Sequence, residues 1–228
     1  MKIKYLSHAC FLIEENGTRI IIDPFLSANP KAPVNENGVD ADYVLISHAH
    51  GDHMLDAFTI AKRCGSTIIS SAEISTYAQA KGLQAHSLHI GGGYNFPFGR
   101  VKLTIAHHGS SIHGADGIPV NLGIACGFLI TMGGKTVYHA GDTGLFLDMK
   151  LIGEMNRIDA ALLPIGDNYT MGIDDAVKAV EFLNPKLAIP MHYDTFDVIP
   201  ADPEEFVSKV KAAGGNAQVV AFGGEIEI

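Results

Sequence analysis

The stretch Ser47-His48-Ala49-His50-Gly51-Asp52-His53 brings three imidazoles and one carboxylate within six residues. It continues the short apolar run Tyr43–Ser47, which is typical of a buried strand. Side chains two residues apart on a strand or loop point the same way, so His48 and His50 can reach one cation. Asp52 and His53 follow where the chain turns into a helix, and they can bind a second cation nearby. Imidazole and carboxylate ligands suit Zn²⁺ or a related first-row divalent ion.

An alternative interpretation of this stretch, with no functional role, is a histidine-rich surface turn or a set of histidines that are hydrogen-bonded in the core. For a lone histidine, that alternative is the better one. The HxHxDH spacing directly after an apolar strand favours a metal site, because four side chains of ligand type then meet at one strand end.

The composition is that of a folded globular chain. Its 228 residues are 47% hydrophobic and 18% charged, which predicts a single domain over 1–228 with a large core. The 16 Lys and Arg residues and 25 Asp and Glu residues give a net charge of −9. Since nucleic-acid binding depends on neutralising phosphates, this charge disfavours a nucleic-acid partner. It also disfavours an anionic membrane surface.

The cysteines and the N-terminal residues bear on the cellular compartment. Cys10, Cys64 and Cys126 are odd in number and widely spaced, so we expect no disulfide framework. The opening MKIKYLSHACFLIEE lacks the apolar core of a signal peptide, and no run of about 20 apolar residues occurs. We therefore expect a cytoplasmic protein with no membrane partner, and the sequence leaves a homo-oligomer open.

The order of strand and helix patterns predicts two mixed sheets packed face to face, with helices outside. Asn16-Gly17 predicts a hairpin turn near the N-terminus, and Ser70-x-x-Glu73 predicts a helix cap. The Gly-rich residues 109–123 are expected to form a loop that could serve as a lid. Gln218–Phe222 and Glu225–Ile228 are expected to be the last strands. The fold class is therefore α/β, as a four-layer sandwich.

Further motifs follow HxHxDH in a fixed order, and together they resemble the metallo-β-lactamase fold superfamily. They are Ile22-Asp23-Pro24, the pair His107-His108, Asp142 in HAGDTG and His192 in PMHY. More narrowly, the chain resembles the UPF0173 group of metal-dependent hydrolases, through SHA at 7–9, GDNYTM at 166–171 and HYDTF at 192–196. This resemblance covers essentially the whole chain. It implies the αβ/βα sandwich, with the metal site at one edge between the two sheets.

The resemblance also implies a ligand set for two divalent ions, Zn²⁺ in the first place and Mn²⁺ or Fe²⁺ as alternatives. One ion would be held by His48, His50 and His108, the other by Asp52, His53 and His192, with Asp142 bridging them. Five histidines and two aspartates are too many ligands for one tetrahedral site. Adjacent histidines point to opposite sides, and the resemblance favours His108 over His107. Taken alone, Asp142 could equally cap a helix that begins near residue 145.

Other residues have weaker claims. The resemblance suggests that His8 lies near the metals, although a structural, hydrogen-bonding histidine is an equal alternative. Asp23 is expected to buttress the site, and Asn168, Tyr169 and Thr170 to line its pocket. Asp52 could orient the nucleophile as well as bind metal. His8 and Tyr169 are both candidates for protonating the leaving atom.

The favoured function is a metal-dependent hydrolase in which a hydroxide shared by two ions cleaves an ester, lactone, thioester or phosphoester of a small, soluble substrate. One alternative is a phosphodiesterase or ribonuclease acting on nucleic acid, which the net charge disfavours. Another is a non-catalytic binding module stabilised by metal, which the complete ligand set disfavours. Di-iron proteins that reduce oxygen or nitric oxide resemble HxExD instead, but position 50 is His. True β-lactamases commonly have Cys where Asp142 stands.

Overall fold

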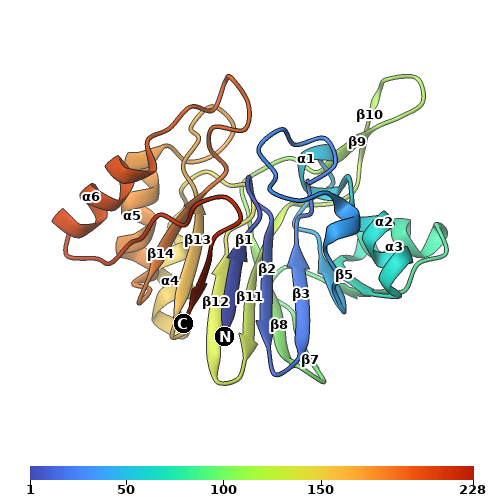
Figure 1. The fold of residues 1–228 in the computed structure, drawn as a ribbon, viewed down its shortest axis with the longest axis horizontal. Helices are drawn as coiled ribbons and strands as arrows, with labels where there is room; N and C mark the ends of the chain where they lie inside the picture. The colour runs from blue at the N-terminus through green and yellow to red at the C-terminus, as the bar shows by residue number, and fades with distance from the viewer.

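Two mixed β-sheets pack face to face in the computed structural model, which describes all of residues 1–228 (Figure 1). In spatial order, the first sheet consists of β15 (Glu225–Glu227), β1 (Lys2–Tyr5), β2 (Phe11–Glu15), β3 (Thr18–Ile22), β4 (Tyr43–Leu45), β5 (Thr67–Ser71) and β6 (Ala85–Leu88). The second consists of β14 (Ala188–Met191), β13 (Ala160–Pro164), β12 (Lys135–His139), β11 (Cys126–Met132), β8 (Gly99–Ile105) and β7 (Gly93–Phe96).

Helices cover the outer faces, so that the molecule has four layers (Figure 1). Those beside the first sheet are α1 (Gly51–Met54), α2 (Ala57–Cys64) and α3 (Ala72–Ala80). Those beside the second sheet are α4 (Asp148–Met155), α5 (Ile173–Leu183) and α6 (Pro203–Ala212). A short 3-10 helix, η1, spans Glu36–Gly38. The predicted α/β sandwich of two mixed sheets is confirmed. No helix is long and apolar enough to cross a bilayer.

The isoleucines of β3 show how the layers are held together. Ile20 and Ile22 belong to a core of 43 buried residues that joins the two sheets and continues beneath the helices α4–α6. Ile21 points the other way, into a second core of 15 buried residues shared with α2 and α3. Because successive strand side chains alternate between faces, an unbroken apolar run marks a strand covered on both sides. Burying each isoleucine fully contributes about 1.5–3 kcal/mol.

The directions of the strands place the loops that carry the predicted site residues at one edge of the two sheets. β1 and β3 each pair antiparallel with β2, and β4 pairs parallel with β3. In the second sheet, β8 and β12 each pair antiparallel with β11, whereas β13 and β14 continue parallel from β12. The strands β1, β3 and β4, and likewise β8, β12 and β14, therefore end on the same side of their sheet. In Figure 1 this edge is at the top, and both termini lie at the bottom.

Several local predictions are settled by the structure. The hairpin turn is confirmed, since Asn16 and Gly17 have φ values of 51° and 78°, as a type I′ turn requires. The helix cap at Ser70 was wrong by one residue. Ser70 still belongs to β5, where its Oγ donates to the Ile46 carbonyl at 2.6 Å, and Ser71 occupies the N-cap.

The predicted strand Gln218–Phe222 is absent. Beside the isolated bridge Ala188–Ala217, the Gln218 amide donates to the Ala188 carbonyl of β14 at 3.0 Å. The chain then crosses to the first sheet, where the Gly223 amide donates to the Tyr5 carbonyl at 2.7 Å. A segment that changes sheets cannot pair continuously with either one. Residues 109–123, expected to be a loop, contain a two-stranded hairpin made of β9 (Ser111–His113) and β10 (Pro119–Asn121). It projects from the body beyond α1 (Figure 1).

Candidate metal centre

Every predicted ligand comes from the end of a strand at the shared edge or from the loop that follows it, and so do His8 and Asp23. His8 follows β1, Asp23 follows β3, residues 47–53 follow β4, His108 follows β8, Asp142 follows β12 and His192 follows β14. His8, Asp23 and His192 have φ values of 57°, 45° and 56°, in the left-handed region that most residues avoid. The backbone thus bends sharply at these three residues, at a cost of about 1–3 kcal/mol each.

Three ring nitrogens converge in a first group. His48 Nε2 lies 3.0 Å from His50 Nδ1, and His108 Nε2 lies 3.3 Å from that same nitrogen. Two nitrogen ligands of one tetrahedral zinc ion are about 3.3 Å apart, given bonds of about 2.0–2.1 Å. The spacing of these three nitrogens is therefore that of ligands to a single ion.

His8, Asp52, His53 and His192 form a second group, whose ligand atoms all lie within 4.8 Å of one another. Asp52 Oδ2 lies 3.2 Å from His8 Nε2 and 3.9 Å from His53 Nε2. His8, which the sequence left open, is completely buried here, and its ring centroid is 4.0 Å from that of His192.

The carboxylate of Asp142 lies between the two groups. Its Oδ2 is 2.9 Å from His192 Nε2 and 3.3 Å from His53 Nε2, both in the second group. The same oxygen is 3.7 Å from His108 Nε2 and 4.0 Å from His48 Nε2, both in the first. The alternative role of Asp142 as a helix cap is excluded, because α4 begins at Asp148 and its N-cap is Leu147.

Asp23 contacts residues of both groups, in the supporting role expected from the sequence. Its Oδ2 lies 2.8 Å from His53 Nδ1 and accepts a hydrogen bond from Ser47 Oγ at 2.5 Å. Its Oδ1 accepts from the Ser47 amide at 2.7 Å, and Ser47 Oγ lies 2.9 Å from His48 Nδ1. These contacts engage the Nδ1 atoms of His48 and His53 and leave their Nε2 atoms facing the cluster.

Burial and charge set the protonation of the cluster. Burial lowers the pKa values of His48, His50 and His108, which keeps these rings neutral with a free lone pair. Burial alone would raise the pKa of Asp142, but the rings of His192 and His53 outweigh it and hold that pKa well below its usual range. Neutral imidazoles around an ionised carboxylate are the ligand forms that divalent metals need.

His53 differs from the other rings. Burial would lower its pKa, but the carboxylates of Asp142, Asp23 and Asp52 together raise it well above its ordinary value. In the absence of a cation, this ring thus takes up the positive charge that the surrounding carboxylates favour.

The cluster passes a simple test for a metal site. His53 Nε2, both ring nitrogens of His192 and Asp142 Oδ1 are buried and have no hydrogen-bond partner. A buried polar atom without a partner costs about 1–3 kcal/mol. Cations held by the cluster would account for His53 Nε2, Asp142 Oδ1 and one ring nitrogen of His192, and the donor set of imidazoles and carboxylates fits zinc or a similar ion.

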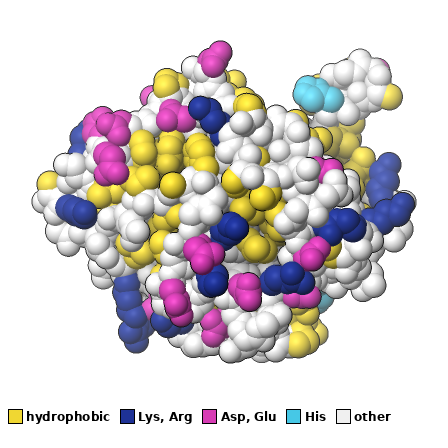
Figure 2. Space-filling model, in the orientation of Figure 1, with side chains coloured by type: hydrophobic (Ala, Val, Ile, Leu, Met, Phe, Trp, Pro, Cys, Tyr) yellow, Lys and Arg dark blue, Asp and Glu magenta, His cyan; other side chains and the backbone are white.

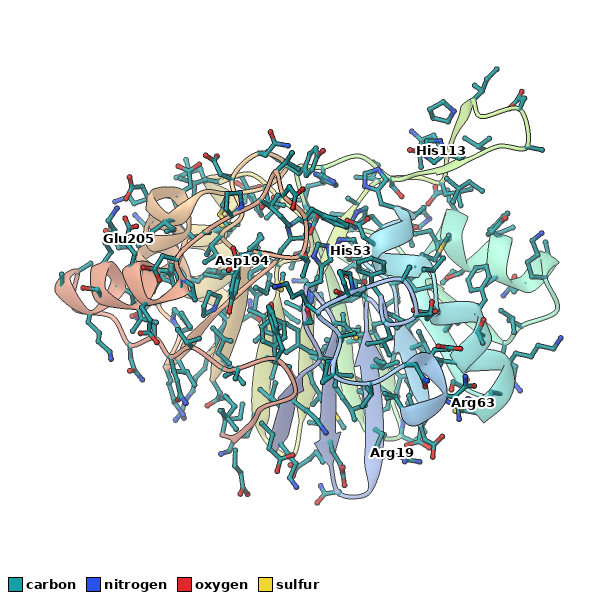
Figure 3. All side chains as sticks on the ribbon, turned by 45° about the horizontal axis from the view of Figure 1, so that its top comes forward. Arg19, His53, Arg63, His113, Asp194 and Glu205 are labelled. Atoms are coloured by element: carbon teal, nitrogen blue, oxygen red, sulfur yellow. The ribbon has the colours of Figure 1, made fainter.

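The remaining predicted residues divide into those near the cluster and those away from it. His107 is exposed and stacks on Phe146 at 4.9 Å, whereas its neighbour His108 enters the cluster. Tyr169 lines a cavity beside the cluster, as predicted, but Asn168 and Thr170 do not. Figure 3 shows His53 at the strand ends near the centre of the molecule, and His113 out on the projecting hairpin.

Two residues with clear contacts to the site were missed at the sequence level. Thr195 Oγ1 lies 2.5 Å from His8 Nδ1, and Ser110 Oγ accepts from the Ala49 amide at 3.2 Å. Thr195 stands in the HYDTF motif and Ser110 two residues after His108, so their positions next to ligands were the only signal. Hydroxyl residues are too common in loops for that signal to be specific.

Two cavities open beside the cluster and share His50 and Asp52 as wall residues. The Val198 cavity, of about 610 Å³, is formed by Phe25, Tyr169, Phe196, Asp197 and Val198 over His50, Asp52, His108, Asp142 and His192. The Met54 cavity, of about 650 Å³, has as its main walls Met54, Leu55, Phe58, Tyr77 and Ile112. No Lys or Arg lines either cavity.

Comparison with known proteins agrees with this fold. Residues 2–192 match the family model described as a beta-lactamase superfamily domain. A UPF0173 metal-dependent hydrolase of Carboxydothermus hydrogenoformans is 50% identical, with 94% of each chain covered. One of Pelotomaculum thermopropionicum is 48% identical over the whole of both chains. A solved structure, a novel metallo hydrolase of Ignicoccus hospitalis, superposes with a TM-score of 0.90 at 38% identity, covering 100% of this chain and 98% of its own.

The fold and the histidines and aspartates clustered at the strand ends define a member of the metallo-β-lactamase superfamily. Within that superfamily, the chain belongs to the UPF0173 family of metal-dependent hydrolases, which confirms the resemblance seen in the sequence. It is thus an enzyme of the metal-dependent hydrolase class.

Proposed function

We propose that this protein is a dinuclear metal-dependent hydrolase that cleaves a carboxylic ester, thioester or lactone in a small molecule. The observation that carries the proposal is the position of Asp142 Oδ2, within 4.0 Å of ring nitrogens from both ligand groups. His48, His50 and His108 would hold one ion, and Asp52, His53 and His192 the other, with Asp142 shared. When bound, two divalent ions supply Lewis acidity and a water that is acidic enough to react at neutral pH.

Asp52 orients the attacking water, and His8 in turn holds Asp52. Burial, together with the neighbouring His192, lowers the pKa of His8 to about 4, so the ring carries a single proton at neutral pH. Because an ionised Asp52 can only accept, that proton is on Nε2, and the Thr195 hydroxyl donates to Nδ1. Both ring nitrogens of His8 are then engaged. This leaves Tyr169, which lines the Val198 cavity, as the better candidate for protonating the leaving atom.

The cavity walls favour a small carboxyl substrate over nucleic acid. Neither cavity has a Lys or Arg in its wall, and Asp197 adds a carboxylate to the Val198 cavity. A polynucleotide needs cationic side chains along its backbone, and the net charge of −9 supplies no surplus of them. The three free cysteines, two of them buried, support a cytoplasmic location for this activity.

A hydrolysis panel on protein reloaded with Zn²⁺ or Mn²⁺ tests the proposal. Esters, thioesters, lactones and phosphodiesters are compared at equal concentration, with Asp142→Ala as the matched inactive variant. Turnover of a carboxyl substrate that is lost in Asp142→Ala supports the proposal. Faster turnover of phosphodiesters, or turnover that survives in Asp142→Ala, overturns it, as does a fully loaded protein that only binds metal.

A further inference from the structure

The Met54 cavity has no part in the proposed reaction, but it lies next to the cluster where that reaction takes place. It begins at His50 and Asp52, the two residues it shares with the Val198 cavity, and extends away from the cluster towards α2, α3 and β9. Its outer wall is formed by Ser111, Ile112 and His113 of β9, at the root of the hairpin in the stretch that the sequence predicted to be a loop and a possible lid. Figure 2 shows apolar side chains gathered at the root of this projecting hairpin.

Each cavity has a group of apolar side chains away from the shared residues, next to polar ones such as His113 in the Met54 cavity and Asp197 in the Val198 cavity. Leu55, with 48% of its surface exposed, faces the Met54 cavity, and Val198, with 52% exposed, faces the Val198 cavity. Aromatic side chains complete each wall, Phe58 and Tyr77 in the first and Phe25 and Phe196 in the second. Large apolar side chains left exposed on both sides of a polar centre are typical of a binding site.

We propose that the substrate lies across the His50–Asp52 segment, with one apolar group in the Met54 cavity and another in the Val198 cavity. This inference rests on the proposed function and narrows its substrate class to esters or thioesters that carry apolar groups on both sides of the scissile bond. Water adds to the acyl carbon and the acyl–oxygen or acyl–sulfur bond breaks. The products are a carboxylic acid and an alcohol or thiol, each with its apolar group in its own cavity.

Binding can be measured without turnover, using dialkyl ketones that keep the carbonyl but cannot be hydrolysed. Zinc-loaded protein with ¹³C-labelled methionine and valine methyl groups is titrated with pentan-3-one and nonan-5-one by NMR. The Met54 methyl reports on the first cavity and the Val198 methyls on the second. We expect nonan-5-one to shift both sets with one dissociation constant, about tenfold or more below that of pentan-3-one, because each added methylene is removed from water.

Three matched variants locate the two groups. Leu55→Glu and Val198→Glu each put a charge into one cavity, and Leu151→Glu changes a residue of α4 that lines neither. Leu151 is 52% exposed, so all three substitutions start from side chains of similar exposure and should fold. Zinc content is measured for each variant. We expect Leu55→Glu and Val198→Glu to weaken nonan-5-one about tenfold and to leave pentan-3-one nearly unchanged, and Leu151→Glu to change neither.

An ester series completes the test, with the acyl chain and the alkyl chain lengthened separately. We expect the wild-type protein to prefer long chains on both sides of the ester. One cavity variant should lose the preference for a long acyl chain, and the other the preference for a long alkyl chain. Separate dissociation constants at the two reporters, ketone affinity independent of chain length, or equal weakening by Leu151→Glu would overturn the spanning arrangement even if esters are hydrolysed. Ketone binding as expected without hydrolysis of any ester would support the arrangement while contradicting the proposed function.

Discussion

His53 Nδ1 lies 2.8 Å from Asp23 Oδ2, and neither side chain is exposed to solvent. Asp23 thereby fixes the ring of His53 so that its Nε2 faces Asp142 Oδ2, 3.3 Å away. The same carboxylate accepts from the amide and the hydroxyl of Ser47, the residue directly before His48. One buried aspartate thus contacts residues of both groups.

Replacing Asp23 should therefore weaken metal binding although it is not a proposed ligand. For Asp23→Ala we expect zinc affinity to fall about 10–100-fold, because His53 and His48 lose the contacts that orient them. Competition with a chromophoric chelator measures this affinity, and Asp40→Ala, an exposed carboxylate far from the cluster, is the control. Unchanged zinc affinity in Asp23→Ala would show that the rings are held by packing alone.

Asp142→Ala should damage activity more than any change at His8. Asp142 faces nitrogens of both groups, whereas His8 contacts only Asp52 and Thr195 by hydrogen bonds from its ring. We expect hydrolysis to fall by orders of magnitude in Asp142→Ala with a circular dichroism spectrum near wild type, and by a smaller factor in His8→Ala. A variant Asp142→Ala that keeps most of its turnover with metal present would rule out the shared carboxylate.

The loop that presents Asp142 depends on Gly141. Gly141 has φ 63°, and a Cβ on it would lie 2.5 Å from the Cys126 carbonyl oxygen. We expect Gly141→Ala to lower the free energy of unfolding by about 2 kcal/mol or more, since both strain and a backbone clash oppose it. Gly144→Ala is the matched control, because a Cβ there meets no atom within 4 Å. Equal urea midpoints for the two variants would contradict this explanation.

Asp159 gives a pH-dependent contribution away from the metal cluster. Burial would raise its pKa, but Lys186 Nζ at 2.6 Å and the Thr136 amide at 2.8 Å lower it below its ordinary value. A lowered native pKa stabilises the fold above the unfolded pKa of about 3.9, and this stability is lost as the pH falls towards the native value. Asp159→Asn should thus cost about 1 kcal/mol at pH 7.

Urea unfolding of wild type and Asp159→Asn between pH 2.5 and 7, at about 25 °C, checks this dependence. We expect the difference in free energy of unfolding to be constant above pH 5 and to shrink below about pH 4. A difference that grows as the pH falls would have the wrong sign for an aspartate with a lowered pKa.

The sequence was most informative where ligands are close together or stand at strand ends. HxHxDH needed no other residue to indicate a metal site, because its spacing is local. Asp142 and His192 became candidates through family motifs, and the structure then showed them 2.9 Å apart. That contact depends on β12 and β14 ending on one side of the sheet, which periodicity alone cannot establish.

The cavity walls could not be predicted in the same way. Ile112 and Tyr77 look like ordinary apolar residues of a strand and a helix, and only the fold brings them beside His50. The hairpin β9–β10 lies in a Gly-rich stretch. Its many turn residues predict a loop, and two strands of only three residues are too short to give a recognisable strand pattern. Likewise, Gln218–Phe222 has the composition of a strand, but the segment connects one sheet to the other and therefore forms no strand.

Anomalous X-ray diffraction from crystals of the zinc-loaded protein, recorded on both sides of the zinc absorption edge, tests the dinuclear centre most directly. The account predicts two peaks per chain. One should be about 2.0–2.2 Å from His48, His50 and His108, and the other at that distance from Asp52, His53 and His192, with Asp142 touching both. A single peak at full zinc loading, or two peaks that do not share Asp142, would contradict it.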